Sequence, residues 1–521
     1  MSISKVYSAQ LSGLNTHIVD IEVDLSNGLH SFSIVGLGDK AIDESKDRIS
    51  AAIKNSGYVS PKQKNQKVVI SLAPAHIRKE GPSFDLGMAL AYLSASGELS
   101  FEAEGRIFLG ELSLEGEVRG VSGILPIVNS IKESGFKEIY VPKDNAIEAG
   151  LVKGIKIYPV KDLNEIINHL KLTDKFKISP QKHTKIKLHN SKHEDDFNII
   201  QGQETAKRAL EIAAAGGHNI GLFGPPGTGK TMLAKAFKSI LPKLKYDEIL
   251  EVTSIHSIAH TLDRPFISDP PFRSPHHTSS YPSLVGGGPF PKPGEITLAH
   301  RGVLFLDEFP EFDKKVIESL RQPLEDHCVT ISRAKGALTF PAKCIVIISM
   351  NPCPCGYGKE KGCNCSEKDI NNYNKKISGP IIDRIDMWVS VSKIEYDKLS
   401  NSSKNNESSV DICKRVDSAR RIQEKRFKKF NIVGKSYIDN TDKTYIKKYN
   451  SEMNVSDIEK CIVLDTEVSD LLKSSTSKLG LSARAYHRII KLSRTIADLE
   501  KSEKIKKQHV LEALQYRQRW F

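Results

Sequence analysis

The feature that most constrains this chain is a glycine-rich segment that lies between a short apolar stretch and a helical one. Residues 221–223 read as the end of a strand, and residues 232–237 read as the beginning of a helix. The segment between them matches the pattern of a phosphate-binding loop, and consists of Gly224, Pro225, Pro226, Gly227, Thr228, Gly229, Lys230 and Thr231. Its glycines allow backbone amides to surround phosphate groups at a helix N-terminus. The segment therefore predicts a nucleotide site on an α/β domain.

Two side chains of this loop have separate expected roles. Lys230 would reach the β- and γ-phosphates of ATP, and the Thr231 hydroxyl would coordinate Mg²⁺. The loop pattern alone also arises by chance in long chains, so it needs support from elsewhere in the sequence.

That support comes from two apolar runs that end in polar residues. Residues 303–306 form a wholly apolar strand followed by Asp307 and Glu308, at the strand end where a parallel sheet places its functional groups. We expect Asp307 to hold the Mg²⁺ shell and Glu308 to polarise the attacking water. A second apolar run, 344–350, ends in Asn351, which would sense the γ-phosphate or orient the water.

Arginines follow these elements, and the order of P-loop, Asp-Glu pair, asparagine and arginines resembles the AAA+ superfamily. An arginine supplied by a neighbouring subunit neutralises charge that develops only in the transition state. We expect Arg384 to be this arginine finger, with a structural ion pair as the alternative, and Arg484 to be the second sensor arginine. A finger of this kind implies a homo-oligomeric ring.

With 521 residues the chain is too long for one hydrophobic core. We predict a multidomain α/β protein with four segments: an N-terminal α+β domain over 1–168, a basic linker over 169–195, a parallel-sheet ATPase core over 196–392, and a helical C-terminal lid over 393–521. In the N-terminal domain, hydrophobic patterns predict strands at 16–24, 68–72, 107–110 and 138–142, and helices through 41–45 and 124–134.

The formal charge of +13 and the isoelectric point near 9.1 are compatible with a polyanionic partner. A Lys- and Asn-rich composition can also reflect genome bias, so charge alone leaves the partner open. No apolar run approaches the ~20 residues that a membrane span needs, and the first residues lack the apolar core of a secretory signal. We therefore expect a cytoplasmic protein with no membrane partner.

Five further segments resemble the YifB/ComM family of magnesium-chelatase-like proteins. They are residues 272–278, 284–288, 293–300 and 351–356, together with the short stretch 264–266, and the resemblance extends over nearly the whole chain. Members of this family are described as hexameric DNA helicases that drive branch migration during natural transformation. The resemblance thus implies a homo-hexamer that acts on single-stranded or branched DNA, with recombination proteins as further partners.

Two loops of the predicted core fit a DNA motor. Residues 329–340 read as a β-hairpin with Arg333 and Lys335 near its tip. In related AAA+ helicases a hairpin at this place projects into the pore, where basic residues contact DNA phosphates without reading sequence. A solvated hairpin with incidental charge is the alternative. Residues 286–288, three glycines, are similar to an inserted pore loop but also fit an ordinary flexible loop.

The N-terminal domain resembles the Lon-protease-like domain in residues 79–83, 110–112 and 120–125. Ser83 stands where that family has its nucleophile, but the position of the general-base lysine is taken by Leu125. Because a serine needs an adjacent base to attack a peptide bond, we do not expect proteolysis.

Four of the eight cysteines crowd into a short segment in the order C-x-C, a seven-residue spacer and C-x-C. They are Cys353, Cys355, Cys363 and Cys365. Four thiolates suit tetrahedral Zn²⁺, and free or redox-active thiols are the alternative.

Taken together, these patterns predict an ATP- and Mg²⁺-dependent AAA+ motor that acts on DNA as a helicase. One competing hypothesis is a metal-insertion or protein-remodelling ATPase of the magnesium chelatase kind. The other is an ATP-dependent protease, against which Leu125 argues.

Overall fold

The structure is a computed structural model that describes residues 2–171, 177–186, 195–288, 292–333, 336–357, 363–393, 407–435 and 444–517. Within it the chain divides into two units. The first contains Met1–Leu188 and Ile249–Ile267, and the second contains His189–Glu248 and Ser268–Phe521. Helix α8 (Tyr246–Ile258) contributes residues to both units.

The second unit is built around a five-stranded parallel sheet with the order β11-β14-β17-β10-β18. Its strands are β10 (Ile220–Phe223), β11 (Phe272–Arg273), β14 (Val303–Leu306), β17 (Ile345–Met350) and β18 (Met387–Ser390). Every residue of β14 and β17 is buried. Such uniform burial explains the unbroken apolar runs in the sequence, because a parallel sheet is covered on both faces.

Helix α6 precedes the first of these strands, and short helices and ribbons connect the others. The helices are α6 (Glu204–Gly216), α7 (Lys230–Ala236), α9 (Tyr281–Val285), α10 (Glu295–Leu298), α11 (Lys314–Ser319), α12 (Arg321–Asp326), α13 (Glu367–Lys375) and α14 (Gly379–Ile382). The antiparallel ribbons are β12 (Gly286–Gly287) with β13 (Lys292–Pro293), and β15 (Cys328–Arg333) with β16 (Gly336–Pro341).

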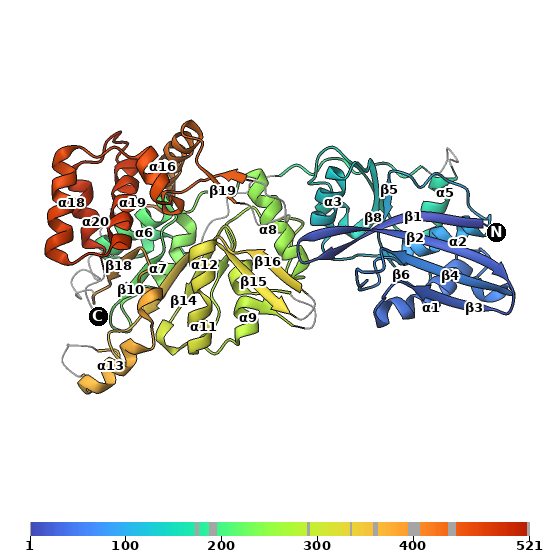
Figure 1. Ribbon diagram of the computed structural model, residues 1–521, viewed down its shortest axis with the longest axis horizontal. Helices are drawn as coiled ribbons and strands as arrows, with labels where there is room; N and C mark the ends of the chain where they lie inside the picture. Colours follow the sequence, from blue (N-terminus) through green and yellow to red (C-terminus); the bar gives the residue numbers. More distant parts are fainter. Residues whose placement is uncertain are drawn as a thin grey trace. The chain divides into compact units, whose positions relative to one another are not determined.

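The C-terminal part of the second unit is helical. It contains α16 (Ser409–Lys429), α17 (Val455–Cys461), α18 (Thr466–Leu479), α19 (Ala483–Leu499), α20 (Lys507–Gln515) and the short ribbon β19 (Val433–Lys435) with β20 (Thr444–Ile446). Figure 1 shows α18, α19 and α20 side by side, in red. Ile412 and Leu492 from these helices belong to the same hydrophobic core as Ile220 of the sheet. The helical part and the sheet therefore stabilise each other.

The described part of the first unit combines two larger sheets and the antiparallel ribbon β6–β7 with five helices and part of α8. One sheet has the order β1-β2-β4-β3, with β3 parallel to β4 and the other pairs antiparallel, and the second is the parallel sheet β5-β8-β9. The strands are β1 (Ser2–Ser12), β2 (Asn15–Asn27), β3 (Ser31–Val35), β4 (Gln66–Ala73), β5 (Arg106–Phe108), β6 (Glu111–Leu112), β7 (Val118–Arg119), β8 (Glu138–Pro142) and β9 (Lys156–Val160). The helices are α1 (Lys40–Asn55), α2 (Asp85–Ala95), α3 (Ile124–Glu133), α4 (Ala146–Ala149) and α5 (Leu163–Leu170).

Each predicted strand and helix of this unit coincides with an observed element of the same type. Strands β1, β3, β6, β7 and β9 and helices α2, α4 and α5 were not predicted. For α2 the reason lies in its burial. Ten of its 11 residues are buried, so it has no polar face and no amphipathic period that a sequence pattern could reveal.

Part of the stretch expected to be an exposed basic linker instead lies against the first unit. Ile178 is buried, the Gln181 amide donates to the Ile157 carbonyl over 2.7 Å, and the Thr184 amide donates to the Gly150 carbonyl over 2.8 Å. One buried apolar side chain and these backbone hydrogen bonds anchor residues 177–186, which the polar composition of the stretch concealed.

Candidate nucleotide-binding site

The glycine-rich loop connects β10 to α7, as its sequence pattern predicts. Gly227 and Gly229 have φ values of 75° and 87°, which favour glycine, and no atom lies within 4 Å of where a Cβ would stand at either residue. A Cβ on Gly224 would lie 2.0 Å from the Val391 carbonyl oxygen. The loop thus needs glycine at three positions, once for close packing and twice for a left-handed backbone that faces open space.

Lys230 is held inside this loop. Its side chain is 7% exposed, and Nζ donates to the carbonyl oxygens of Gly224 and Pro225 at 2.7 and 2.8 Å and to Oδ1 of Asn351 at 3.1 Å. Burial lowers the pKa of Lys230, and the carboxylates of Asp307 and Glu308 oppose that shift. The ammonium group and the strand-end amide therefore meet at one point, as a phosphate site with a sensor residue requires.

Asp307 follows β14 and lies beside the first turn of α7. The Thr231 hydroxyl donates to its Oδ2 at 2.8 Å, and the Ser349 hydroxyl donates to its Oδ1 at 2.7 Å. The parallel register that pairs Leu306 with Ile348 brings Ser349 to this place. Ser349 was not predicted as a site residue, although its signal was present: it is the only polar residue of the β17 strand.

Glu308 is exposed and has φ 50° and ψ 45°, a left-handed conformation that is uncommon outside glycine. Its Oε2 lies 3.4 Å from Nδ1 of His277, which follows the neighbouring strand β11. Backbone strain of this kind is concentrated at functional sites. His277 belongs to a segment that carried the family resemblance, but no sequence pattern indicated that it contacts Glu308.

The two predicted arginines meet at a third residue that the sequence did not indicate. Arg384 follows α14 and forms an ion pair with Oε2 of Glu325 on α12, and it also donates to the Pro380 carbonyl at 2.7 Å. Arg484, in the first turn of α19, lies 3.4 Å from the other oxygen of the same carboxylate. These arginines lower the pKa of Glu325. The structure brings Arg384 and Arg484 together, and their contacts here are not with Lys230 or Asp307.

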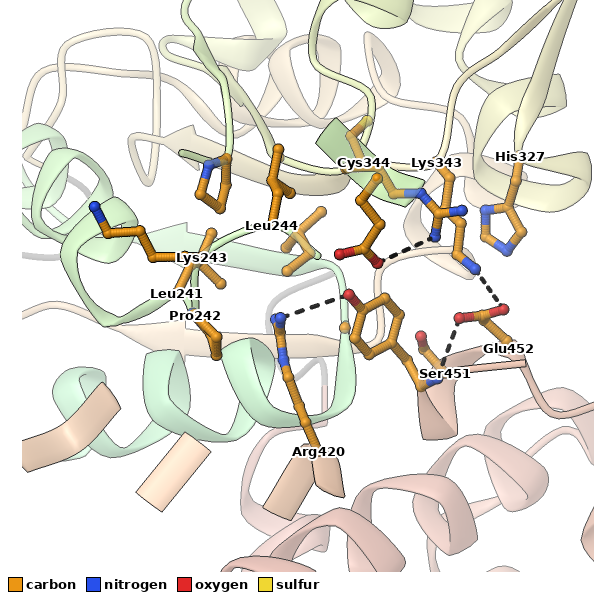
Figure 2. A pocket seen from close by; sticks show the side chains of 17 residues that line it. Leu241, Pro242, Lys243, Leu244, His327, Lys343, Cys344, Arg420, Ser451 and Glu452 are labelled. Carbon is orange, nitrogen blue, oxygen red and sulfur yellow. Dashed lines mark hydrogen bonds and ion pairs between the residues drawn. The ribbon is translucent and has the colours of Figure 1, made fainter. Parts of the chain in front are cut away.

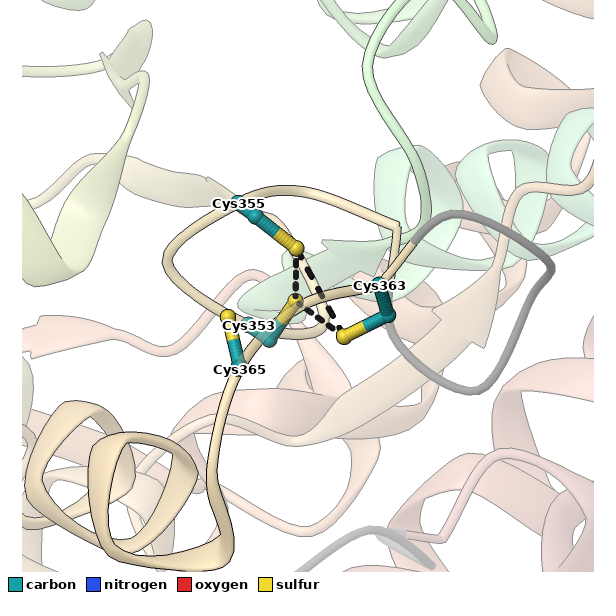
Figure 3. Close-up of side chains that lie close together, drawn as sticks. All are labelled: Cys353, Cys355, Cys363 and Cys365. Atoms are coloured by element: carbon teal, nitrogen blue, oxygen red, sulfur yellow. Dashed lines mark hydrogen bonds between the residues drawn. The ribbon is translucent and has the colours of Figure 1, made fainter.

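The four clustered cysteines converge, as Figure 3 shows. The Cys353 sulfur lies 3.2 Å from that of Cys355 and 3.8 Å from that of Cys363, and Cys355 and Cys363 are separated by 3.6 Å. The sulfur of Cys365 completes the group, and the four sulfur atoms lie within 4.8 Å of one another. No disulfide joins any of the chain's eight cysteines, all of which are described.

The predicted hairpin is formed by β15 and β16, six residues each. Arg333 is the last residue of β15 and pairs with Gly336, whereas Lys335 lies outside the described residues. In the glycine segment, Gly286 and Gly287 form strand β12, and both have positive φ values, 102° and 143°.

A cavity between the sheet and the C-terminal helices is distinct from this site (Figure 2). It is lined by Gly302, which precedes β14, and by Ile345, the first residue of β17, so it lies at the opposite sheet edge from Asp307 and Asn351. Lys343 and Glu452 form an ion pair of 2.6 Å in its wall, and burial lowers the pKa of Lys343 to about 8. This ion pair joins the segment before β17 to the helical part.

The residues of the protease-like segment do not form a serine–lysine pair. Leu125 is fully buried in the apolar core around α3, with Ile124 and Val128. Lys79 is also buried, but its ammonium group donates to the Pro74 carbonyl. Among the described residues, therefore, neither position supplies a base to Ser83. The described helices, in both units, are also too short or too polar for any of them to cross a membrane.

Three protein-family models match this chain. Residues 196–399 match the family model described as magnesium chelatase, subunit ChlI, residues 21–145 match subunit ChlI of Mg-chelatase, and residues 406–517 match the ChlI C-terminal model.

Similarity to individual proteins covers the full length. The chain is 39% identical to competence protein ComM of Haemophilus influenzae over 99% of this chain and 98% of that protein. It is 38% identical to the uncharacterized protein YifB of Escherichia coli over 99% and 97% of the two chains. Over 26% of its length it is 32% identical to Lon protease 2 of Bacillus subtilis, which is covered to 26%.

The full-length similarity agrees with the parallel-sheet core, with its P-loop and Asp-Glu pair, and with the Lon-like first unit. The chain belongs to the YifB/ComM family of magnesium-chelatase-like AAA+ ATPases.

Proposed function

We propose that this protein is an ATP-driven motor that acts on DNA in the cytoplasm, as a homo-hexameric helicase that promotes branch migration or strand integration during recombination. The observation that carries the proposal is the assembled site, in which Lys230, Asn351, Thr231 and Asp307 meet at one sheet edge, in a chain that is similar to a competence protein over its whole length.

The residues of the site fit ATP and Mg²⁺. The open face of Gly227 and Gly229 leaves room for phosphates, and the partners of Lys230 are neutral oxygens that phosphate oxygens can replace. Thr231 and Asp307 would hold Mg²⁺, an ion that prefers oxygen ligands and neutralises the charge of the phosphates. Glu308, exposed beside this pair, would orient the attacking water.

Two features support DNA as the partner. The β15–β16 hairpin directly precedes β17, the strand that delivers Asn351, so movement at the γ-phosphate has a short path to the hairpin. The chain's charge of +13 favours a polyanion. We propose that Arg333 and Lys335 contact DNA phosphates, and that Arg384 and Arg484 complete the ATP site of the next subunit.

The test is the ATPase rate of the full-length protein with no DNA, with single-stranded DNA and with forked DNA, together with displacement of a labelled strand. We expect DNA to stimulate ATP turnover and the strand to be displaced, and Lys230→Ala to abolish both activities. Unchanged turnover and no displacement would contradict the DNA motor while leaving the ATPase intact.

A charge-matched pair of variants sharpens the test. Arg333→Ala/Lys335→Ala should lose most DNA stimulation and keep basal turnover, and the affinity for DNA should depend less steeply on salt concentration. Lys425→Ala/Lys429→Ala removes the same charge from α16 and should behave as the parent protein. Equal losses in both variants would indicate a general charge effect instead of a hairpin contact.

The matches to magnesium chelatase models favour one second candidate, an ATPase that remodels a partner protein or inserts a metal. It predicts turnover that is insensitive to DNA and stimulated by a protein partner. The same assay separates the two candidates.

A further inference from the structure

We propose that Cys353, Cys355, Cys363 and Cys365 bind one Zn²⁺ ion, and that this metal site holds Asn351 in position beside the P-loop. The proposal concerns basal ATP turnover and is independent of whether the motor acts on DNA.

The sulfur geometry fits a single tetrahedral ion. A zinc–sulfur bond of about 2.3 Å places the sulfurs of a regular tetrahedron about 3.8 Å apart, and the shorter separations here are 3.2, 3.6 and 3.8 Å. These distances are too long for disulfides, which need about 2.0 Å. The ligands of a multi-iron cluster bind different iron atoms and would lie farther apart than the 4.8 Å limit seen here.

Two of the sulfurs have backbone amides as neighbours. The backbone amides of Tyr357 and Cys365 form hydrogen bonds with the sulfurs of Cys355 and Cys363. Cys353 is buried and the other three are at least partly accessible, so the ion would have protein on one side and an entry path on the other. Hydrogen bonds of this kind orient ligands and stabilise the negative charge of a thiolate that binds metal.

The cluster follows Asn351 in the chain and lies against the P-loop. Cys353 follows Asn351 by two residues, and the loop then turns at Gly356, whose φ is 90°. A Cβ on Gly356 would lie 2.9 Å from Cδ of Pro226, so the cysteine loop rests on the P-loop. One end of the metal site is therefore in contact with the nucleotide loop.

After Cys365 the chain continues into α13, which contacts Asn351 and the segment that follows the Asp-Glu pair. The backbone N–H of Asn351 donates a hydrogen bond to the Tyr373 hydroxyl oxygen, and burial raises the pKa of Tyr373. Lys376, just after α13, lies 3.0 Å from Glu311, which follows the Asp-Glu pair. An ion that joins Cys353 to Cys365 would close the connection between β17 and α13, and so would fix Asn351 from both sides and reduce the loop entropy.

The first experiment measures metal in full-length protein purified without chelators. We expect about one zinc per chain by mass spectrometry, released in proportion to thiols blocked by a mercurial reagent. Cys363→Ser should contain little zinc. Cys413→Ser, which alters a half-buried cysteine of α16 outside the cluster, should retain it. Iron in place of zinc, or wild-type protein with no metal, would overturn the proposal.

The second experiment tests the positioning of Asn351 with two variants of one ligand. Histidine can replace a cysteine as a zinc ligand and serine cannot do so effectively. Cys365→His should keep zinc and most of the basal turnover. Cys365→Ser should lose zinc, and its kcat should fall by about 10-fold or more while KM for ATP changes by less than about threefold, because Lys230 and Thr231 are unaltered.

Zinc-free wild-type protein, prepared with chelator and reductant, controls for misfolding of the variants. Its kcat should be low and should return when Zn²⁺ is added back, with far-UV circular dichroism unchanged throughout. Wild-type turnover by a folded, zinc-free protein would show that the metal does not position Asn351.

Discussion

The Thr231 hydroxyl donates a hydrogen bond to the Asp307 carboxylate, with 2.8 Å between the oxygens. The two residues come from motifs 76 positions apart in the chain, and the parallel sheet brings them together because β14 and β10 both end at the same edge, on either side of β17. Ser349, Asn351 and Glu308 lie at the same edge. The role of each residue can therefore be tested by a substitution that removes one of its contacts.

The exposed Glu308 is expected to be the residue that activates water. Glu308→Gln should retain nucleotide binding but lose about 10²- to 10⁴-fold in kcat, because a neutral amide cannot accept the proton. The measurement is phosphate release beside binding of a fluorescent ATP analogue. Glu204→Gln is the matched control, since Glu204 is an exposed carboxylate of α6 that pairs with Lys207. A Glu308→Gln enzyme with near-normal turnover would assign the base elsewhere.

Ser349 should act on the site through Asp307. Ser349→Ala removes the hydroxyl that donates to Asp307 Oδ1, and leaves that oxygen with the backbone amide of Glu308 as its remaining contact here. We expect a higher Mg²⁺ concentration for half-maximal ATPase and about a 10-fold loss of activity at low Mg²⁺. Ser349→Thr, which keeps the hydroxyl, should recover most of the loss. Equal Mg²⁺ dependence in all three proteins would contradict this role.

We expect Arg384 and Arg484 to act at the ATP site of the neighbouring subunit. Both form ion pairs with Glu325, and neither contacts Lys230 here. Arg384→Ala and Lys230→Ala should each be inactive alone, with a loss of about 10³-fold or more for the arginine. A mixture of the two should regain ATPase activity, because some interfaces then combine an intact P-loop with an intact arginine. The assay is turnover against mixing ratio, with mixtures of each variant and wild type as controls. No gain at any ratio would argue against a shared site.

We expect low pH to destabilise the second unit because it protonates the Glu248 carboxylate. Although burial opposes it, the charges of Lys448 and Arg301 lower the pKa of Glu248 to about 2. The folded pKa lies below the unfolded value of about 4.3. This carboxylate therefore stabilises the fold at pH values above the unfolded pKa, and the contribution is lost as the pH falls toward the folded pKa.

Glu248→Gln should accordingly lower the free energy of unfolding at pH 7 by about 2–3 kcal/mol, and the difference from wild type should shrink at about pH 3. Urea unfolding of the full chain at several pH values measures this. Glu467→Gln, whose carboxylate is exposed and pairs with Lys507 over 3.0 Å, should change stability by less than about 0.5 kcal/mol. A difference that stays constant with pH would show that charge is not the cause.

The local parts of the site could be predicted because each is written in a short stretch of sequence. The pattern of Gly224 to Thr231 predicts a phosphate-binding loop between a strand and a helix. The apolar runs before Asp307 and Asn351 end where buried parallel strands end. The cysteine cluster was visible in the same way, since its four members lie within one short segment. Helix α2 escaped prediction because burial on all sides removes periodicity.

By itself, the sequence determined the glycine-rich loop, the acidic strand end, the apolar strand before Asn351 and the cysteine spacing, because backbone preferences and hydrophobic patterns act over a few residues. Only the tertiary structure decided that Ser349 donates to Asp307, that His277 lies beside Glu308, and that one carboxylate, Glu325, joins Arg384 to Arg484. An isolated polar residue has many possible partners along the chain, and the packing of the sheet and helices selects the one that it meets.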